Sequence, residues 1–274
     1  MERSQVQKEL AELGRNVAAA RKLLGEIEGL DADRAGNVAS LAARLDKLQA
    51  RVEPLEAASE LGKQLGTWLV EYRAELAAFR EEQSKRFGVE LEQELCAVGL
   101  GLTGHYPELR SGAYTIALDL ERWQVTVWWG PKQERLGSCA MSPKAVAELV
   151  VRLRSELGSH VDEAAFVERL GRALDRAQRD GDEDGMVPII IVLGELALLM
   201  QSRAFLRDPQ REAYRSYSRA DLSSDLCRFN HRVQMRVATR ALARSRDTFL
   251  WVPSDARSGD GAVYSHVRLR KETS

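Results

Sequence analysis

The chain has 274 residues, 44% of them hydrophobic, and a formal net charge of -1 at pH 7. This length and apolar content allow one or two compact domains beside an extended arm. From residue 203 to the C-terminus, 14 Arg and one Lys stand against eight Asp or Glu, so the last quarter of the chain is basic and the rest is acidic.

Cysteine, histidine and hydropathy argue against several classes of protein. The three cysteines, Cys96, Cys139 and Cys227, form no CxxC motif and no even framework, as expected for reduced thiols in a cytoplasmic protein. The N-terminus lacks the apolar segment of a signal peptide, and the longest apolar run, 186–200, contains Glu195 and is too short to span a bilayer. The four histidines are dispersed, and no P-loop, GxSxG or HExxH motif occurs. The glycine run at 99–104 lacks both the Lys and the preceding strand of a phosphate-binding loop. We therefore expect a cytoplasmic protein without a catalytic, metal or cofactor site.

Residues 6–79 carry a heptad pattern. Apolar side chains recur at alternating steps of four and three residues, the spacing that lets helices bury a shared stripe. The pattern predicts a helical coiled-coil arm that associates with itself or with a partner protein. In the first two segments these positions are Val6, Leu10, Leu13, Val17, Ala20, Leu24 and Ile27, then Val38, Leu41, Leu45, Leu48, Val52 and Leu55.

The pattern is interrupted at 31–37, where Asp31 and Arg34 occupy expected core positions. A turn at 29–37 would fold the first helix back on the second as a hairpin. Alternatively, one helix runs through, with a polar patch that fixes the register between chains. The glycine and aspartate content favours the turn, whereas the unchanged phase at Val38 favours continuity. The hairpin is our preferred interpretation.

The second half of the arm contains Pro54 and then larger side chains. Proline removes a helical hydrogen bond and clashes with the preceding turn, so we expect a kink or a junction there. The apolar pattern resumes from Leu61 to Phe79 with aromatic residues, which indicates packing on a globular surface. The helix is expected to end at the glycines of 99–104.

Residues 105–157 predict a small antiparallel sheet flanked by helices. The runs 114–120 and 123–129 are rich in β-branched and aromatic residues and indicate a hairpin, with a third strand at 134–140. A Ser-Pro pair at 142–143 has the chemistry of a helix start and predicts a further helix after the sheet.

The hairpin offers two functional alternatives. Trp123, Trp128 and Trp129 are expected to pack in a core or an interface, although such rings can also stack on nucleobases. Asp119 and its acidic neighbours, with Lys132, could bind a metal in a nuclease-like enzyme. No acid-x-Lys triplet lies on the second strand, so a solvent-facing role for Asp119 is the simpler interpretation.

The C-terminal part begins with a predicted helix at 162–179. The acidic, glycine-rich segment 179–185 follows and is interpreted as a solvated connection, because it lacks the glutamate that closes an EF-hand loop. Residues 187–205 are apolar nearly all round and predict the central helix of this unit.

Arginine recurs at every fourth position twice in the basic quarter. The first series, 203–219, crosses Pro209 and cannot be one helix. The second series falls in a predicted helix from 220 to 244 and would form a basic stripe suited to phosphate oxygens. Two strand-like runs, 248–252 and 262–270, then enclose a polar loop, which is the outline of a winged helix. The predicted nucleic-acid-binding residues are Arg228, Arg232, Arg236 and Arg240 on the helix side and Arg257 on the wing.

These patterns predict a mostly helical α+β fold in three parts: a coiled-coil arm (1–80), a small α/β unit with an antiparallel meander (81–158) and a basic helical unit with a winged-helix-like hairpin (159–274). We expect a non-enzymatic, bacterial-type assembly component that contacts DNA or RNA as a subunit or regulator of a larger complex. One alternative is a scaffold that binds only protein and docks an acidic partner on the arginine stripe. The other is a metal-dependent nuclease that uses Asp119.

Overall fold

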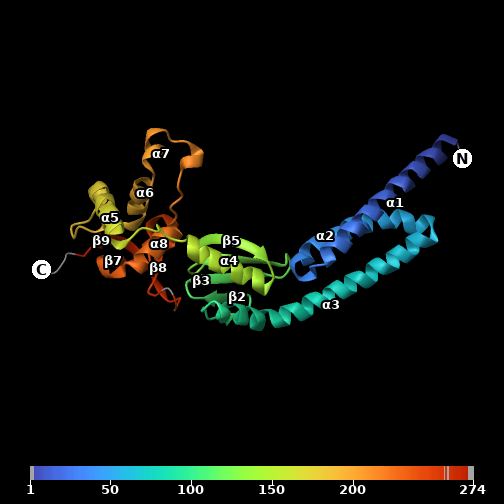
Figure 1. Ribbon diagram of the computed structural model, residues 1–274, viewed down its shortest axis with the longest axis horizontal. Helices are drawn as coiled ribbons and strands as arrows, with labels where there is room; N and C mark the ends of the chain where they lie inside the picture. Colours follow the sequence, from blue (N-terminus) through green and yellow to red (C-terminus); the bar gives the residue numbers. More distant parts are fainter. Residues whose placement is uncertain (1–2, 256, 258, 271–274) are drawn as a thin grey trace. The chain divides into compact units, whose positions relative to one another are not determined.

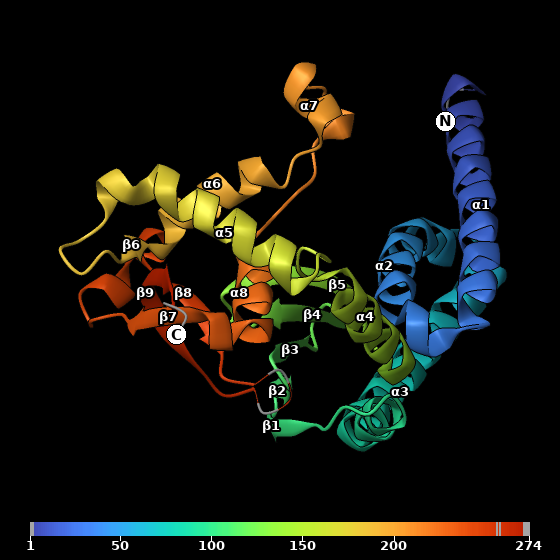
Figure 2. The same cartoon turned by 60° about the vertical axis from the view of Figure 1, so that its left-hand side comes forward.

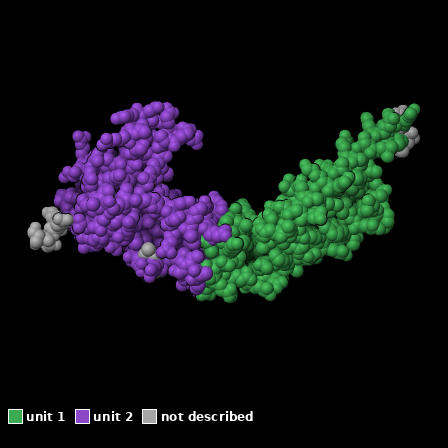
Figure 3. Space-filling view, viewed as in Figure 1, with its two compact units in different colours: residues 1–94, 118–125, 139–147 green, residues 95–117, 126–138, 148–274 purple. Residues whose placement is uncertain are grey.

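The computed structural model describes residues 3–255, 257 and 259–270 (Figure 1). The chain is a mostly helical α+β protein with two antiparallel sheets, as the sequence predicts. It divides into two compact units, each discontinuous in sequence (Figure 3). Unit 1 comprises residues 1–94, 118–125 and 139–147, and unit 2 comprises residues 95–117, 126–138 and 148–274.

The first two helices of unit 1 form an antiparallel hairpin. α1 (Arg3–Asp31) and α2 (Arg34–Ala58) pack against each other, so the predicted turn at 29–37 is confirmed and the continuous helix is not formed. Asp33 caps α2, because its side chain accepts a hydrogen bond from the Gly36 amide at 3.2 Å.

A second reversal separates α2 from α3 (Glu60–Ala97). Pro54 lies inside α2, and the helix continues past it before the chain reverses at Ser59. The Ser59 hydroxyl accepts from the Gly62 amide at 3.0 Å and caps the first turn of α3. Glycine is required there because a Cβ would lie 2.0 Å from the Leu55 carbonyl oxygen. The expected junction is therefore present, but Ser59 rather than Pro54 marks it.

The heptad residues of α2 form the core of the arm. All six apolar heptad positions from Val38 to Leu55 are at most 6% exposed, because α2 packs on α1 along one side and on α3 along another (Figure 2). Among the heptad residues of α1, only Ala20 and Ile27 are buried. Several apolar heptad residues of α1 therefore remain at least partly exposed after α2 has packed on it.

The polar residues that interrupt the heptads form an ion-pair cluster at the α1–α2 turn. Arg34 donates to both carboxylate oxygens of Asp31, at 2.5 and 2.8 Å, and to Glu75 of α3 at 2.5 Å. Its guanidinium lies over the rings of Tyr72 and Phe79, 5.5 and 5.8 Å from their centroids. The hydrogen bonds from Arg34 hold the pKa of Asp31 below its usual range. The cluster therefore closes the turn and joins α3 to it.

The first sheet is a five-strand meander with the order β1-β2-β3-β4-β5. The predicted hairpin and third strand are confirmed as β3 (Tyr114–Asp119), β4 (Gln124–Trp129) and β5 (Glu134–Ala140). Two strands precede the hairpin, β1 (Thr103–His105) and β2 (Glu108–Ser111), and the helix α4 (Pro143–Glu156) follows the sheet.

The second sheet, in unit 2, is built around β9 (Gly261–Leu269). Tyr264 of this strand pairs with Val237 of β7 and with Leu250 of β8, so β7 and β8 lie on opposite edges of β9. Three helices pack on the sheet and bury a common apolar core that includes Phe166, Leu196 and Leu226 (Figure 2). These elements are α5 (Glu163–Ala177), β6 (Val187–Pro188), α6 (Ile189–Leu199), α8 (Arg219–Arg228), β7 (Val233–Val237) and β8 (Leu250–Pro253).

The predicted central helix at 187–205 is wrong in extent. Val187 and Pro188 pair with β9 as a short strand, and α6 starts only at Ile189. Ser202 then caps a separate short helix, α7 (Arg203–Arg207), by accepting from the Phe205 amide at 3.1 Å. Apolar residues are also what a buried strand requires, so composition alone did not separate strand from helix. In the part of the chain that the structure describes, no helix is both long and apolar enough to cross a membrane.

Candidate nucleic-acid interface

The predicted arginine helix from 220 to 244 is not formed. α8 ends at Arg228, and the chain then makes a 3₁₀ turn and enters β7, which pairs with β9. The strand sequence Val233-Gln-Met-Arg-Val alternates apolar and polar residues, which suits a half-exposed strand better than a helix. Arginines four residues apart therefore do not form one stripe.

Two of the five predicted arginines are engaged in ion pairs inside unit 2. Arg232 lies 3.4 Å from the carboxylate of Glu163. Arg236 donates to Asp182 and to Asp184, the latter at 2.8 Å. The segment 179–185, which we predicted to be a solvated connection, is thus tied to β7. The pKa of Asp182 is lowered, first by a hydrogen bond from the Met186 amide and then by Arg236.

The other three arginines are exposed and form no ion pair within the described residues. Arg228, at the end of α8, stacks on the ring of Phe229 with 4.7 Å between the guanidinium carbon and the ring centroid. Arg240 lies in the segment of the chain that connects β7 to β8. Arg257 lies in the β8–β9 loop, where its amide donates to Asp255 at 3.0 Å.

A cleft of about 550 Å³ separates the end of α8 from the β8–β9 loop. Arg228 stands on its helical side, and Asp255, which holds the backbone of Arg257, stands on its loop side. Of the predicted residues, Arg228 lines the cleft, and Arg257 lies two residues after Asp255 in the loop that forms the other wall. The residues that line it are Trp129, Ser224, Cys227, Arg228, Asn230, Ser254 and Asp255. The pKa of the Cys227 thiol is raised, first by burial and then by Asp255, so this cysteine is not an activated nucleophile.

A capping box and a buried carboxylate fix the position of α8. The Ser218 side chain accepts from the Asp221 amide, and the Asp221 carboxylate accepts in return from the Ser218 amide at 2.7 Å. Asp225, only 1% exposed, accepts from the Ser159 amide at 2.9 Å and from the Tyr217 hydroxyl at 2.8 Å. Burial raises the pKa of Asp225 despite these hydrogen bonds. The helix is therefore held firmly behind the cleft.

The buried side of α8 is occupied by an aromatic cluster that joins β4 to β8. The Trp129 indole donates to the Ser223 hydroxyl at 2.7 Å, and that hydroxyl donates to the Trp251 carbonyl oxygen at 2.7 Å. The ring of Trp251 fits between two glycines, since a Cβ at Gly130 would approach it to 2.5 Å and one at Gly261 to 2.6 Å. This side of the helix is consequently unable to meet a ligand.

The predicted packing of the tryptophans is confirmed for two of the three. Trp123 is 3% exposed and Trp129 is 4% exposed, so neither ring can stack on a nucleobase. Trp128 is half-buried and lines a separate polar cleft.

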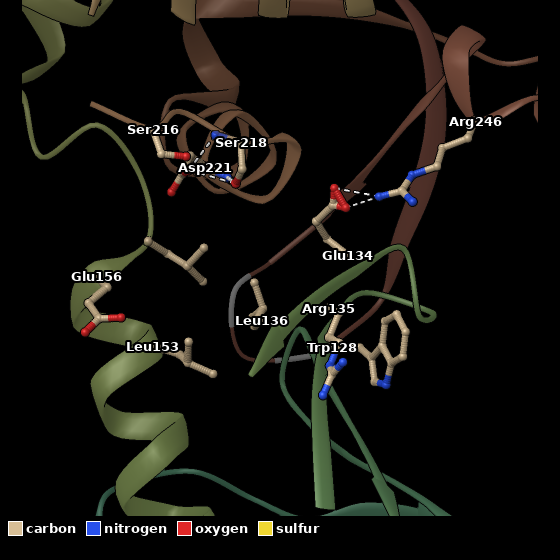
Figure 4. Close-up of a pocket in the computed structure, with 11 residues that line it drawn as sticks. Trp128, Glu134, Arg135, Leu136, Leu153, Glu156, Ser216, Ser218, Asp221 and Arg246 are labelled. Carbon is tan, nitrogen blue, oxygen red and sulfur yellow. Dashed lines mark hydrogen bonds and ion pairs between the residues drawn. The ribbon is translucent and has the colours of Figure 1, made fainter. Parts of the chain in front are cut away.

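This polar cleft, about 760 Å³ in volume, was not expected from the sequence (Figure 4). Two of its three carboxylates have partners: Glu134 is paired with Arg246, and Asp221 accepts from the Gly158 amide at 2.9 Å and from Ser218. The third, Glu156, is exposed. Its walls come from segments far apart in the chain, and no local motif connects them. The Ser218 hydroxyl donates to the Asp221 carboxylate at 2.7 Å, and this pair belongs to the capping box at the start of α8.

Asp119 has a local role. Its carboxylate accepts from the Arg122 amide at 2.9 Å and so stabilises the β3–β4 turn. Across the residues described, no group of three His, Cys, Asp or Glu side chains could hold a metal ion.

The first arginine series lies on a protruding segment between α6 and α8 (Figure 2). The Gln201 side chain closes its base, because its amide donates to the Arg215 carbonyl oxygen at 2.8 Å and accepts from the Arg215 amide at 2.9 Å. Arg203, Arg207 and Arg211 are exposed on this segment.

In comparisons with known proteins, no protein-family model, no curated protein and no solved structure matches the chain.

Proposed function

We propose that this protein is a non-enzymatic assembly component that contacts duplex nucleic acid through unit 2, at the cleft between α8 and the β8–β9 loop. The observation that carries the proposal is the meeting of Arg228 and the Arg257 loop at one open cleft. Guanidinium groups are well suited to phosphate oxygens, and a groove-entering helix flanked by a loop is a recurrent way to hold a duplex.

The order of elements supports the winged-helix hypothesis. α5, β6, α6, α7, α8, β7, β8 and β9 follow one another in the chain, and β9 pairs with β6, β7 and β8. In a winged helix, the helix that precedes the last hairpin is the recognition helix, which here is α8, and the β8–β9 loop is the wing. The inner side of α8 is buried on Trp129 and Trp251, whereas Arg228 at its C-terminal end is exposed. We therefore propose phosphate contacts at the end of the helix rather than base reading along its length.

The wider setting follows from the rest of the chain. Three unpaired cysteines fit a reducing cytoplasm, and the helical arm provides a surface for assembly into a larger complex.

The test is the salt dependence of binding to random-sequence duplex DNA and RNA, measured by fluorescence anisotropy. We expect binding that weakens steeply with salt, and we expect Arg228→Ala plus Arg257→Ala to reduce the slope of log K against log salt by nearly two, at about 0.9 per phosphate contact.

Two other double variants remove the same charge and serve as controls. Arg152→Ala plus Arg154→Ala changes exposed residues of α4 and should leave binding nearly unchanged. Arg232→Ala plus Arg236→Ala changes residues that are already paired with carboxylates, so we expect a smaller loss than at the cleft. If all three double variants lost the same amount of duplex affinity, the loss would be explained by net charge alone, which would contradict the assignment of the cleft.

A protein-only scaffold is the second candidate. The observation that favours it is the internal neutralisation of Arg232 and Arg236, which removes part of the expected basic surface. Absence of any salt-sensitive binding to either duplex would leave this candidate in place of the first.

A further inference from the structure

The N-terminal end of α1 forms an apolar ridge that the described part of the chain covers only in part, since Leu10 is exposed and Val6 and Leu13 are half-buried. α1 extends beyond the α2–α3 reversal at Ser59 (Figure 1), and the contact between Asn16 and Arg51, at 3.4 Å, lies near the end of its pairing with α2. Val6, Leu10 and Leu13 follow at the spacing i, i+4, i+7, which places them on one side of the helix. Leu10 is 62% exposed.

An apolar groove lies beside this ridge, also within unit 1. It has a volume of about 490 Å³, and its walls are α1 on one side and the α2–α3 reversal on the other. Leu61 on its rim is 72% exposed, and Val17 on the opposite rim is 51% exposed. The apolar residues that line the groove are Val17, Ala20, Leu24, Leu55, Leu61 and Leu65.

Ridge and groove are continuous along one helix and have matching lengths. The ridge spans residues 3–13 and the groove runs along α1 from Val17 to Glu28, so both are roughly 15 Å long at about 1.5 Å per residue. A two-fold axis near the middle of α1 would place the ridge of each copy in the groove of the other, which is the condition for a closed, self-complementary interface.

We propose that two copies of this chain associate through antiparallel pairing of their α1 helices, with the ridge of each copy in the groove of the other. Charge favours this direction, because Arg3 at the start of the ridge then lies beside Glu28 at the far end of the groove in the second copy. Parallel pairing would bring the two ridges together and leave both grooves uncovered. The inference rests on the assembly role proposed above and identifies the partner as a second copy.

Size-exclusion chromatography with light scattering on the full chain at tens of micromolar tests the interface. We expect the wild type at twice the chain mass of 30.6 kDa, and Leu10→Glu plus Val17→Glu at the single-chain mass. Both substitutions are at exposed positions, so circular dichroism should show an unchanged helical content. The matched control is Val70→Glu plus Val89→Glu on α3, at positions 67% and 61% exposed, which should remain dimeric. A monomeric wild type, or a Leu10/Val17 variant that stays dimeric, would overturn the proposal.

Disulfide cross-linking tests the direction of the helices. In a Cys96→Ser background, the double variant Gln7→Cys plus Leu24→Cys should oxidise to a covalent dimer, because antiparallel pairing brings these two positions together. Each single variant should remain monomeric on denaturing gels. Cross-linking by Gln7→Cys alone would indicate parallel helices and contradict the proposal.

Duplex binding by the Leu10/Val17 variant separates this inference from the proposed nucleic-acid contact. Retained salt-sensitive binding by the monomeric variant is expected, since the cleft lies in unit 2. If no variant binds duplex and the dimer persists, the nucleic-acid contact is wrong and the self-association stands.

Discussion

At the residue scale, the hydroxyl of Ser223 connects the aromatic cluster to α8. It is fully buried and accepts from Trp129 while donating to the Trp251 carbonyl oxygen. Ser223→Ala leaves the Trp129 indole N–H without an acceptor, so we expect a loss of about 1–3 kcal/mol in the free energy of unfolding. Urea titration of the full chain measures it.

The neighbouring Ser224 is the control for this change. Its hydroxyl makes no hydrogen bond within the part of the chain that the structure describes, so Ser224→Ala should alter the free energy of unfolding by less than about 0.5 kcal/mol. Equal effects of the two substitutions would show that the hydrogen-bond relay is not what Ser223 contributes.

The buried carboxylate of Asp225 predicts a pH dependence of stability. Burial raises its folded-state pKa above the unfolded value, which is near 3.9. Between these two pKa values the folded protein binds more protons than the unfolded chain, so this group lowers the free energy of unfolding as pH rises through the window. Below about pH 3.9 the effect is absent.

Asp225→Asn should remove this slope. We expect the stability of the variant, relative to wild type, to increase as pH is raised from about 4 through the folded-state pKa, as measured by urea titration at successive pH values. Parallel pH profiles for the two proteins would contradict the assignment, whatever the constant offset between them.

At the element scale, two glycines of α3 should respond in opposite ways to the same substitution. Gly62→Ala places a Cβ 2.0 Å from the Leu55 carbonyl oxygen and forces α3 away from α2, so we expect a loss of about 1–3 kcal/mol. Gly88 has no heavy atom within 4 Å of a built Cβ, so Gly88→Ala should stabilise the helix by about 1 kcal/mol. Thermal unfolding of both variants compares them. A shift of the same sign in both would show that the close approach at Gly62 is relaxed in solution.

The helices also show which periodicities carry information. A step of four and three over six apolar residues correctly predicts the buried face of α2. A step of four between charged residues predicts no shared face, because Arg228 and Arg236 lie on a helix and a strand. Burial has to hold the apolar residues on one side, whereas surface arginines have no such constraint.

At the scale of the whole molecule, unit 1 is completed by residues distant in sequence. The Trp123 indole donates to the Ala35 carbonyl oxygen at 3.3 Å, and Arg80 donates to the carbonyl oxygen of Leu120 and lies over the Trp123 ring. The β3–β4 turn is therefore part of the arm's structure.

A fragment of residues 1–94 lacks this turn, whereas a fragment of residues 1–157 retains it. We expect the shorter fragment to unfold at a lower temperature, because Trp123 buries a large aromatic surface in unit 1. Circular dichroism melts at 222 nm compare the two fragments. Equal melting temperatures would show that the three helices need no support from the turn.

The sequence by itself determined the features that depend on neighbours in the chain. The Asp, Gly and Asn of 31–37 favoured a turn between α1 and α2 over a continuous helix, and the strands β3 to β5 follow from alternation and branched side chains. The net charge of each part of the chain, acidic before residue 203 and basic after it, also follows directly from the sequence. Each of these signals acts over a few residues, where periodicity and turn chemistry are direct.

Only the tertiary structure decided which side chains are available for binding. Arg236 is neutralised by carboxylates that precede it by more than fifty residues, Trp129 is covered by β8, and the ridge of α1 is left exposed by the early end of α2. Pairing across the chain depends on how the elements pack, and packing is set by the whole apolar core rather than by any local pattern. The candidate cleft at Arg228 and the α1 surface are therefore products of the assembled fold.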